Sequence, residues 1–245
     1  MAGTIDDLAE LREEADVIQQ QLEATEARQR PTSATDESGT ITVTLDESGA
    51  VSNVRVDRGW RNAMAPDELP TGVLDALTTA GMQRVERWTE DLDDVEKSES
   101  FRPRPPQADK FLSGLVRAVE RHEAGTEELL QLTSEMVSEL LEGIEKAERL
   151  LDEHATHEYV GLSRRRHVRA TITGNSTVTA IWIDPKWLRN AHEINLGHEI
   201  TTAITAGLEK ARAGGLTAIM KNSGLARVTE LMNNPRAIHE GIRRG

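Results

Sequence analysis

The sequence predicts an α+β fold made of two repeated units, each with a long helix, an antiparallel β-hairpin or small sheet, and a C-terminal helix. The first observation is that residues 41–84 align without a gap with residues 168–211, 127 positions further along the chain. The second is that apolar residues alternate through a strand pair in both passages and then recur with helical spacing. Because residue types and periodicity are both kept, we interpret the passages as tandem copies packed as an intrachain pseudo-dimer.

The alignment pairs polar and aromatic residues as well as apolar ones. Asp57 and Trp60 align with Asp184 and Trp187. The aligned apolar pairs are Leu45 with Ile172, Val54 with Ile181, Val56 with Ile183, Val73 with Ile200, and Leu77 with Ile204. Aromatic residues make up only 3% of the chain, so each copy alone would bury a small core. We therefore expect the two copies to gain stability by packing against each other.

The predicted organisation has four parts. Residues 1–100 form the first unit, residues 101–108 a proline-rich linker, residues 109–213 the second unit with long helices, and residues 214–245 an amphipathic basic tail. The linker contains the segment FRPRPP, whose three prolines cannot continue a helix and stiffen an extended chain.

In the first unit, residues 5–27 have apolar side chains three or four positions apart, which predicts an amphipathic helix. Residues 31–39 (PTSATDESG) have the composition of a loop. Residues 41–56 alternate apolar and polar positions on both sides of a central turn, which predicts a β-hairpin with an irregularity near Asn53. A helix is then expected from Leu69 to Trp88.

In the second unit, Gly125 followed by Thr126 predicts a helix stop and a capped restart. We therefore expect helices over residues 109–124 and 126–154, followed by the repeated hairpin and helix over residues 168–213. The remaining residues predict one or two short amphipathic helices with a basic end.

The composition argues against an enzyme. The chain has no cysteine, which removes disulfides, thiolate metal ligands and a cysteine nucleophile and is compatible with a reducing cytoplasm. Glycine-rich phosphate loops, the hydrolase motif G-x-S-x-G and the zinc motif H-E-x-x-H are not found. An apolar run of ~18 residues and a basic, apolar leader are also missing. We expect a cytoplasmic protein without membrane span, catalytic residues, metal or cofactor.

Three smaller groups of residues have a structural explanation. His154 and His157 lie among carboxylates at a predicted helix end, where a solvated cap is expected more often than a metal site. Asp57 and Asp184 each follow a strand and are expected to accept turn N–H groups rather than to act as an acid–base pair. The two aligned tryptophans are expected to anchor the loop after each hairpin against the core, with base stacking as the functional alternative.

Charge is distributed unevenly along the chain. The net charge is -13, but residues 164–245 hold 13 Lys or Arg against 6 Asp or Glu, whereas residues 1–100 hold 9 against 23. Nucleic-acid phosphates require only such cations, so the C-terminal third carries the best binding candidates. The predicted nucleic-acid-binding residues are Arg164, Arg165, Arg166, Arg169, Lys186, Arg189, Lys210 and Arg212. The alternative is that the arginine run pairs with Glu139, Glu142 and Glu145 in a surface ion-pair cluster.

The strand pairs and the helices around them resemble the YbaB/EbfC family of bacterial nucleoid-associated proteins. The resemblance rests on residues 41–45 and 49–57 in the first copy and on residues 168–173 and 178–185 in the second, where Ile183-Asp184-Pro185 matches best. It implies an α+β unit that pairs through its sheet into a dimer with projecting helices, and DNA binding with little sequence preference.

Together these observations predict a non-enzymatic protein that binds duplex DNA through its basic C-terminal half, as a monomer or a homodimer. The alternative is a protein–protein adaptor, chaperone or scaffold that docks partners through its acidic helices and its tail, without nucleic acid. The resemblance gives this alternative a concrete form, because actinobacterial relatives can be encoded beside type VII secretion genes. The acidic net charge favours the adaptor, whereas the resemblance favours DNA.

Overall fold

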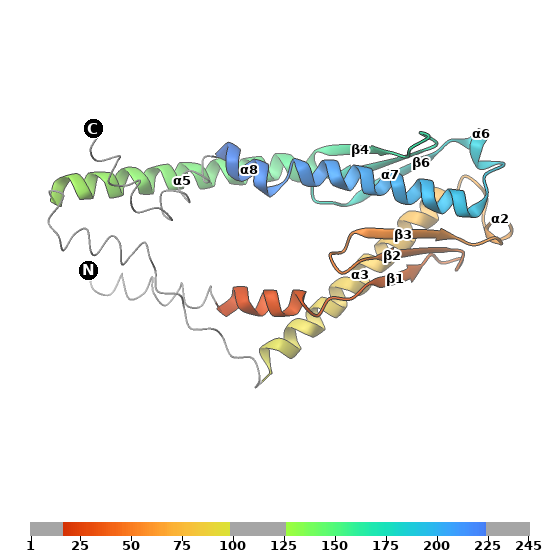
Figure 1. Ribbon diagram of the computed structural model, residues 1–245, viewed down its shortest axis with the longest axis horizontal. Coiled ribbons are helices and arrows are strands. Elements are labelled where there is room, and N and C mark those ends of the chain that lie inside the picture. The colour runs from red at the N-terminus through yellow and green to blue at the C-terminus, as the bar shows by residue number, and fades with distance from the viewer. Residues whose placement is uncertain (1–16, 99–125, 224–245) are drawn as a thin grey trace. The chain divides into compact units, whose positions relative to one another are not determined.

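The computed structural model describes residues 17–98 and 126–223 (Figure 1). The predicted linker, the predicted helix over residues 109–124 and the tail beyond residue 223 lie outside the described residues. Contacts divide the chain into two compact units, residues 1–106 with 158–210 and residues 107–157 with 211–245. The first of these units contains both sheets of the protein's described part, each antiparallel and three-stranded. The predicted α+β class is therefore confirmed.

The first sheet has the strand order β1-β2-β3 and consists of β1 (Thr32–Thr35), β2 (Ile41–Leu45) and β3 (Val51–Val56). Every second residue of β2 is buried, which explains the alternation in its sequence. The pairing register of β2 with β3 shifts after the pair formed by Thr44 and Asn53. The predicted hairpin and its irregularity near Asn53 are thus confirmed.

The loop predicted for residues 31–39 is wrong in its first half, because that half forms β1. Thr32 pairs with Leu45 of β2. Such pairing through main-chain hydrogen bonds cannot be predicted from a local composition rich in serine and threonine. Thr32 and Ala34 are buried, and β1 lies in contact with helix α3 (Leu69–Glu96). A short edge strand therefore forms where its neighbour and a helix cover it, despite weak local preference.

The second sheet has the strand order β4-β5-β6 and consists of β4 (Glu158–Leu162), β5 (Val168–Thr173) and β6 (Val178–Ile183). The hairpin of β5 and β6 was expected, whereas β4, like β1, was not. The register of β5 with β6 shifts after Thr171, the residue 127 positions beyond Thr44. Strand order, pairing and irregularity therefore agree between the two sheets at the offset of the sequence alignment.

Two helices follow each hairpin. After β3 come α2 (Trp60–Ala63) and α3, and after β6 come α6 (Pro185–Leu188) and α7 (Glu193–Ala213). Helix α3 continues beyond the predicted end at Trp88, because the acidic residues that follow are compatible with a helix. Gly214 and Gly215 separate α7 from α8 (Leu216–Ser223).

The second compact unit contains helices α5 (Thr126–Thr156) and α8, which contact each other. The stop and restart predicted at Gly125 lie at the border of the described residues, which resume at Thr126 with α5. In the first unit, residues 17–26 are helical, as expected for the described part of the predicted N-terminal helix.

Within the first unit, helix α7 packs closely against the edge of the first sheet. The main-chain N–H of Val54 in β3 donates to the Thr201 hydroxyl at 2.9 Å. A Cβ atom at Gly197 would lie only 2.2 Å from the Val54 carbonyl oxygen, so the approach requires glycine.

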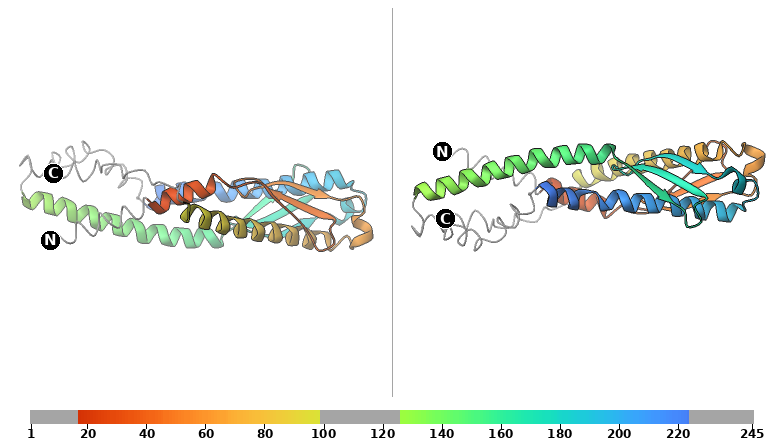
Figure 2. Two further views of the ribbon diagram at one scale, coloured as in Figure 1. Left: turned by 90° about the horizontal axis from the view of Figure 1, so that it is seen from below. Right: turned by 90° about the horizontal axis from the view of Figure 1, so that it is seen from above.

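Helix α3 contacts β1 and β2 of the first sheet and also β6 of the second. Both views in Figure 2 show the strands of the two sheets alongside α3 and α7.

Arg61 makes a further connection between the two sheet-bearing parts of the first unit. Its Nη2 atom donates to the carbonyl oxygens of Leu188 and Ala191, at 3.0 and 2.9 Å. Its guanidinium carbon lies 4.5 Å from the centroid of the Trp60 ring, and Trp60 is fully buried. Arg61 thereby satisfies the last carbonyl group of α6 and one carbonyl group of the loop that follows it.

Candidate nucleic-acid interface

The turn between β4 and β5 holds three consecutive arginines at its tip. Ser163 and Val168 close the turn, with the N–H of Ser163 donating to the Val168 carbonyl at 3.0 Å and the N–H of Val168 donating to the Ser163 hydroxyl at 3.1 Å. The N–H of Arg166 donates to the Ser163 carbonyl at 2.9 Å. The side chains of Arg164, Arg165 and Arg166 are all exposed, and these hydrogen bonds involve only main-chain groups and the Ser163 hydroxyl.

Helix α6 lies at the same end of the second sheet as this turn. The N–H of Asp184 donates to the His167 carbonyl at 2.8 Å, and the Asp184 carboxylate accepts from the N–H of Lys186 at 2.9 Å. The rings of His167 and Trp187 are stacked, with centroids 4.7 Å apart and planes 6° from parallel. These contacts hold the exposed Lys186 and Arg189 beside the turn.

Arg169 completes this cluster from the first positions of β5. It is exposed, and its guanidinium carbon lies 5.5 Å from the centroid of the Trp182 ring on the neighbouring strand. We refer to Arg164, Arg165, Arg166, Arg169, Lys186 and Arg189 as the basic edge. The structure thus brings six of the eight predicted residues to one end of one sheet. Among the described residues, the three turn arginines have no ion-pair partner.

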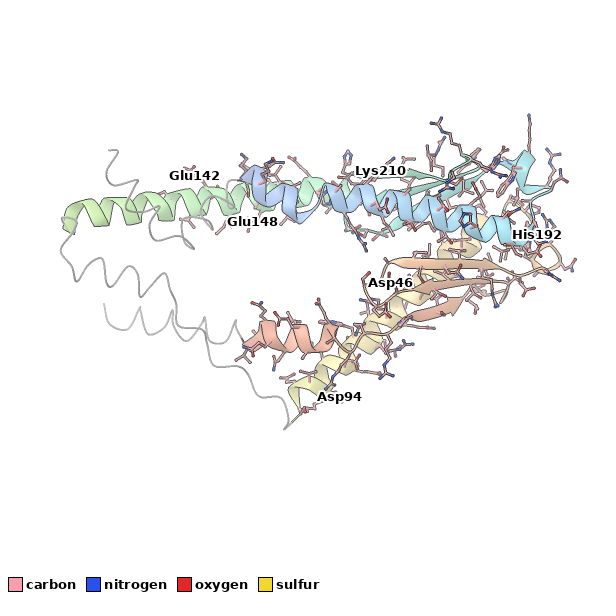
Figure 3. All side chains as sticks on the ribbon, in the orientation of Figure 1. Asp46, Asp94, Glu142, Glu148, His192 and Lys210 are labelled. Carbon is pink, nitrogen blue, oxygen red and sulfur yellow. The ribbon has the colours of Figure 1, made fainter. Side chains whose placement is uncertain are left out.

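The other two predicted residues are placed differently. Lys210 lies on α7, and its Nζ atom donates to the Val160 carbonyl at 2.6 Å, on the outer edge of β4 (Figure 3). A lysine in this position covers an open strand edge, which is a common protection against unwanted strand pairing. Arg212 is exposed and belongs to the second compact unit.

The corresponding turn of the first sheet has the opposite charge. It spans residues 36–40, and Asp36 takes the place of Ser163, accepting the N–H of Ile41 at 2.7 Å. Glu37 stands where the second sheet has Arg164, and its N–H donates to the Asp75 carboxylate at 3.1 Å. The same turn geometry therefore exposes one carboxylate, that of Glu37, in the first sheet and three guanidinium groups in the second.

A second group of cations lies elsewhere in the first unit. Arg28, Arg30 and Arg87 line a hollow together with Ala27, Gln29 and Asp91. Arg87 donates to the Thr32 hydroxyl at 3.1 Å, and Gln29 donates to the Asp91 carboxylate at 3.3 Å. The sequence did not indicate this group, because its members are far apart in a strongly acidic part of the chain.

The structure agrees with the turn role predicted for Asp57 and Asp184 and with a core position for Trp60, whereas Trp187 is not buried in the core. The Asp57 carboxylate accepts the N–H of Gly59 at 3.1 Å, as Asp184 does for its own turn. Trp60 is buried, and Trp187 is partly covered by its stacked histidine. Among the described residues, no three His, Asp or Glu side chains are grouped closely enough to hold a metal ion.

In the order of the chain, the long helix α5 precedes the three-stranded antiparallel second sheet, and the helix α7 follows it. Residues 130–223, which include this sheet, match the YbaB/EbfC DNA-binding family. The resemblance predicted from the sequence is confirmed for this stretch, and the family is one of nucleoid-associated, DNA-binding proteins rather than enzymes. No curated protein and no solved structure matches the chain. None of the described helices is sufficiently long and apolar to cross a membrane.

Proposed function

We propose that this protein is a cytoplasmic, non-enzymatic, nucleoid-associated protein that binds duplex DNA with little sequence preference through its basic C-terminal half. The observation that carries the proposal is the basic edge, which gathers six exposed cations at one end of the second sheet. The match of residues 130–223 to a DNA-binding family supports the same conclusion.

The chemistry of the basic edge fits phosphate groups. Arginine stays charged at any physiological pH and presents a planar set of donors that suits phosphate oxygens. Contacts to phosphates fix the position of a protein on a duplex but carry little sequence information. The acidic turn of the first sheet would repel the same phosphates, so we expect DNA to contact the turn of the second sheet and not that of the first.

We further propose that the chain arose as a tandem repeat and folds as a pseudo-dimer. The two sheets share strand order and register at a constant offset of 127 residues, which supports this interpretation. Val54 and Arg61 connect the first copy to α7 and α6 of the second. The internal pairing leaves the whole chain free to act as a monomer or to form a homodimer.

The test is DNA binding over a salt series, measured by fluorescence anisotropy with a labelled duplex. The test variant replaces four arginines of the basic edge with Gln: Arg164, Arg165, Arg166 and Arg169. The control variant replaces three exposed arginines that precede or belong to the first sheet with Gln: Arg28, Arg30 and Arg55. The slope of log K against log salt should flatten by up to ~0.9 for each lost phosphate contact in the first variant. The control should keep the slope of the wild type.

A protein–protein adaptor is the second candidate function. Helix α5 exposes Leu141, Ile144 and Leu151 among acidic residues such as Glu142 and Glu148 (Figure 3). Apolar side chains on an acidic helix suit a partner with a complementary basic and apolar surface. If micromolar protein fails to bind the duplex at ~50 mM salt, where phosphate-driven binding is strong, the adaptor becomes the better explanation.

A further inference from the structure

The outer face of the second sheet differs from that of the first in a way that the fold does not require. In the second sheet this face carries two rows of paired residues, Val160 with Thr171 and Ala180, and Leu162 with Arg169 and Trp182. Trp182 is 48% exposed and Val160 is 40% exposed. An apolar surface around an exposed tryptophan is therefore open on this face.

The first sheet supplies an internal comparison. The aligned rows on its outer face are Ser33 with Thr44 and Asn53, and Thr35 with Thr42 and Arg55. Every residue in these rows is polar. Because both sheets have the same register, a sheet of this kind can fold with a polar outer face. The apolar outer face of the second sheet, with its valine, leucine, alanine and tryptophan, is therefore better explained by binding than by folding.

We propose that this face binds unpaired nucleic-acid bases by stacking on Trp182, while Arg169 and the turn arginines hold the adjoining phosphates. Aromatic side chains on open sheet faces offer stacking surfaces to bases of any sequence. The Arg169 guanidinium carbon lies over the Trp182 ring, 5.5 Å from its centroid, so a base that replaces the guanidinium on the ring would leave this cation free to meet the adjoining phosphate. In a duplex the faces of the bases are already stacked, so this face selects single strands.

The charge on this face favours nucleic acid over a second copy of the chain. A symmetric pairing of two such faces would bring Arg169 and the turn arginines of both chains near each other, and like charges in contact oppose association. A single strand has the opposite charge and exposed aromatic bases. Its phosphates therefore suit Arg169 and the turn arginines, and its bases suit Trp182. This inference rests on the proposed phosphate contacts of the basic edge and adds a second nucleic-acid form to them.

The experiment compares a labelled dT20 oligonucleotide with a 20-base-pair duplex, using the full chain and the variants Trp182→Thr and Trp182→Phe. Loss of one stacked base should weaken dT20 binding by about 5- to 150-fold in Trp182→Thr. Trp182→Phe should retain most of the affinity, because phenylalanine also stacks. Binding to the duplex should be unchanged in both variants. Circular dichroism and thermal unfolding would verify that each variant is folded.

The outcomes separate the two proposals. Equal binding of dT20 by wild type and Trp182→Thr overturns the stacking inference but leaves the duplex proposal intact. Binding of dT20 without binding of the duplex overturns the duplex proposal and supports stacking. If Trp182→Thr instead turns a dimer into a monomer in light scattering and leaves dT20 affinity unchanged, the face is a contact between copies and the inference is wrong.

Discussion

Arg166 has the left-handed backbone conformation of Gly39, the residue that occupies the same place in the first sheet. Their φ angles are 60° and 70°, and each N–H donates at 2.9 Å to the carbonyl of the residue that opens its turn. An L-residue with a Cβ atom is disfavoured in this conformation, whereas glycine is not. Arginine at this position therefore costs stability that the fold could avoid, which is consistent with a role for its charge.

Replacement of Arg166 by Gly should separate stability from binding. We expect the free energy of unfolding to rise by up to about 1 kcal/mol, because relief of the left-handed strain outweighs the added freedom of the unfolded chain. The slope of log K against log salt for duplex binding should become less steep by ~0.9, the value of one phosphate contact. Urea unfolding and anisotropy titrations measure the two effects. A less stable variant with unchanged binding would contradict the assigned role.

The close approach of α7 to β3 predicts that Gly197 cannot be replaced. In Gly197→Ala the new Cβ would overlap the Val54 carbonyl oxygen, so helix and strand must separate, and we expect a loss of about 1–3 kcal/mol. Gly81 on α3 is the matched control, since a Cβ there meets no atom within 4 Å. Gly81→Ala should be stabilising by about 0.5–1 kcal/mol. Thermal unfolding of both variants tests this prediction. Equal stabilities of the two variants would disprove the close packing at Gly197.

Arg61 of α2 and Arg58 in the loop before α2 should contribute differently to the stability of the fold. Arg61→Ala leaves two carbonyl groups without their donor, so we expect a loss of about 1–3 kcal/mol. Arg58 pairs with Glu193 at 3.2 Å, but its side chain is 85% exposed, and Arg58→Ala should cost less than about 1 kcal/mol. Urea unfolding at low and high salt tests this order. A larger effect for Arg58 would contradict it.

The acidic turn of the first sheet offers a gain of function. Glu37→Arg with Ser38→Arg reproduces the arginines of the second sheet on a turn whose left-handed position is already Gly39. If turn geometry and charge suffice for phosphate contact, the variant should bind a duplex more tightly at low salt. Its salt slope should steepen by up to ~0.9 for each new contact. An unchanged slope would show that the turn needs other parts of the basic edge.

Much of the fold could be predicted because the alternation of apolar and polar residues is clear in both aligned passages. The two hairpins and the irregularity near Asn53 follow from local patterns. The edge strands β1 and β4 could not be predicted, since they depend on pairing with a neighbour and on cover from a helix. Sequence reasoning found the cations of the basic edge as a group of charges, but only strand register places Arg169 beside Trp182.

The opposite charges of the two turns have a consequence for how the protein would occupy a chromosome. Two identical subunits would carry two identical phosphate-binding ends, and such a dimer could clamp two segments of DNA. Here Glu37 and Arg164 are encoded at separate places in one chain, so substitution at one leaves the other unchanged. With a single basic edge, one chain would contact a duplex through one site. Cross-linking of distant DNA segments would then require a second chain, which makes compaction depend on protein concentration.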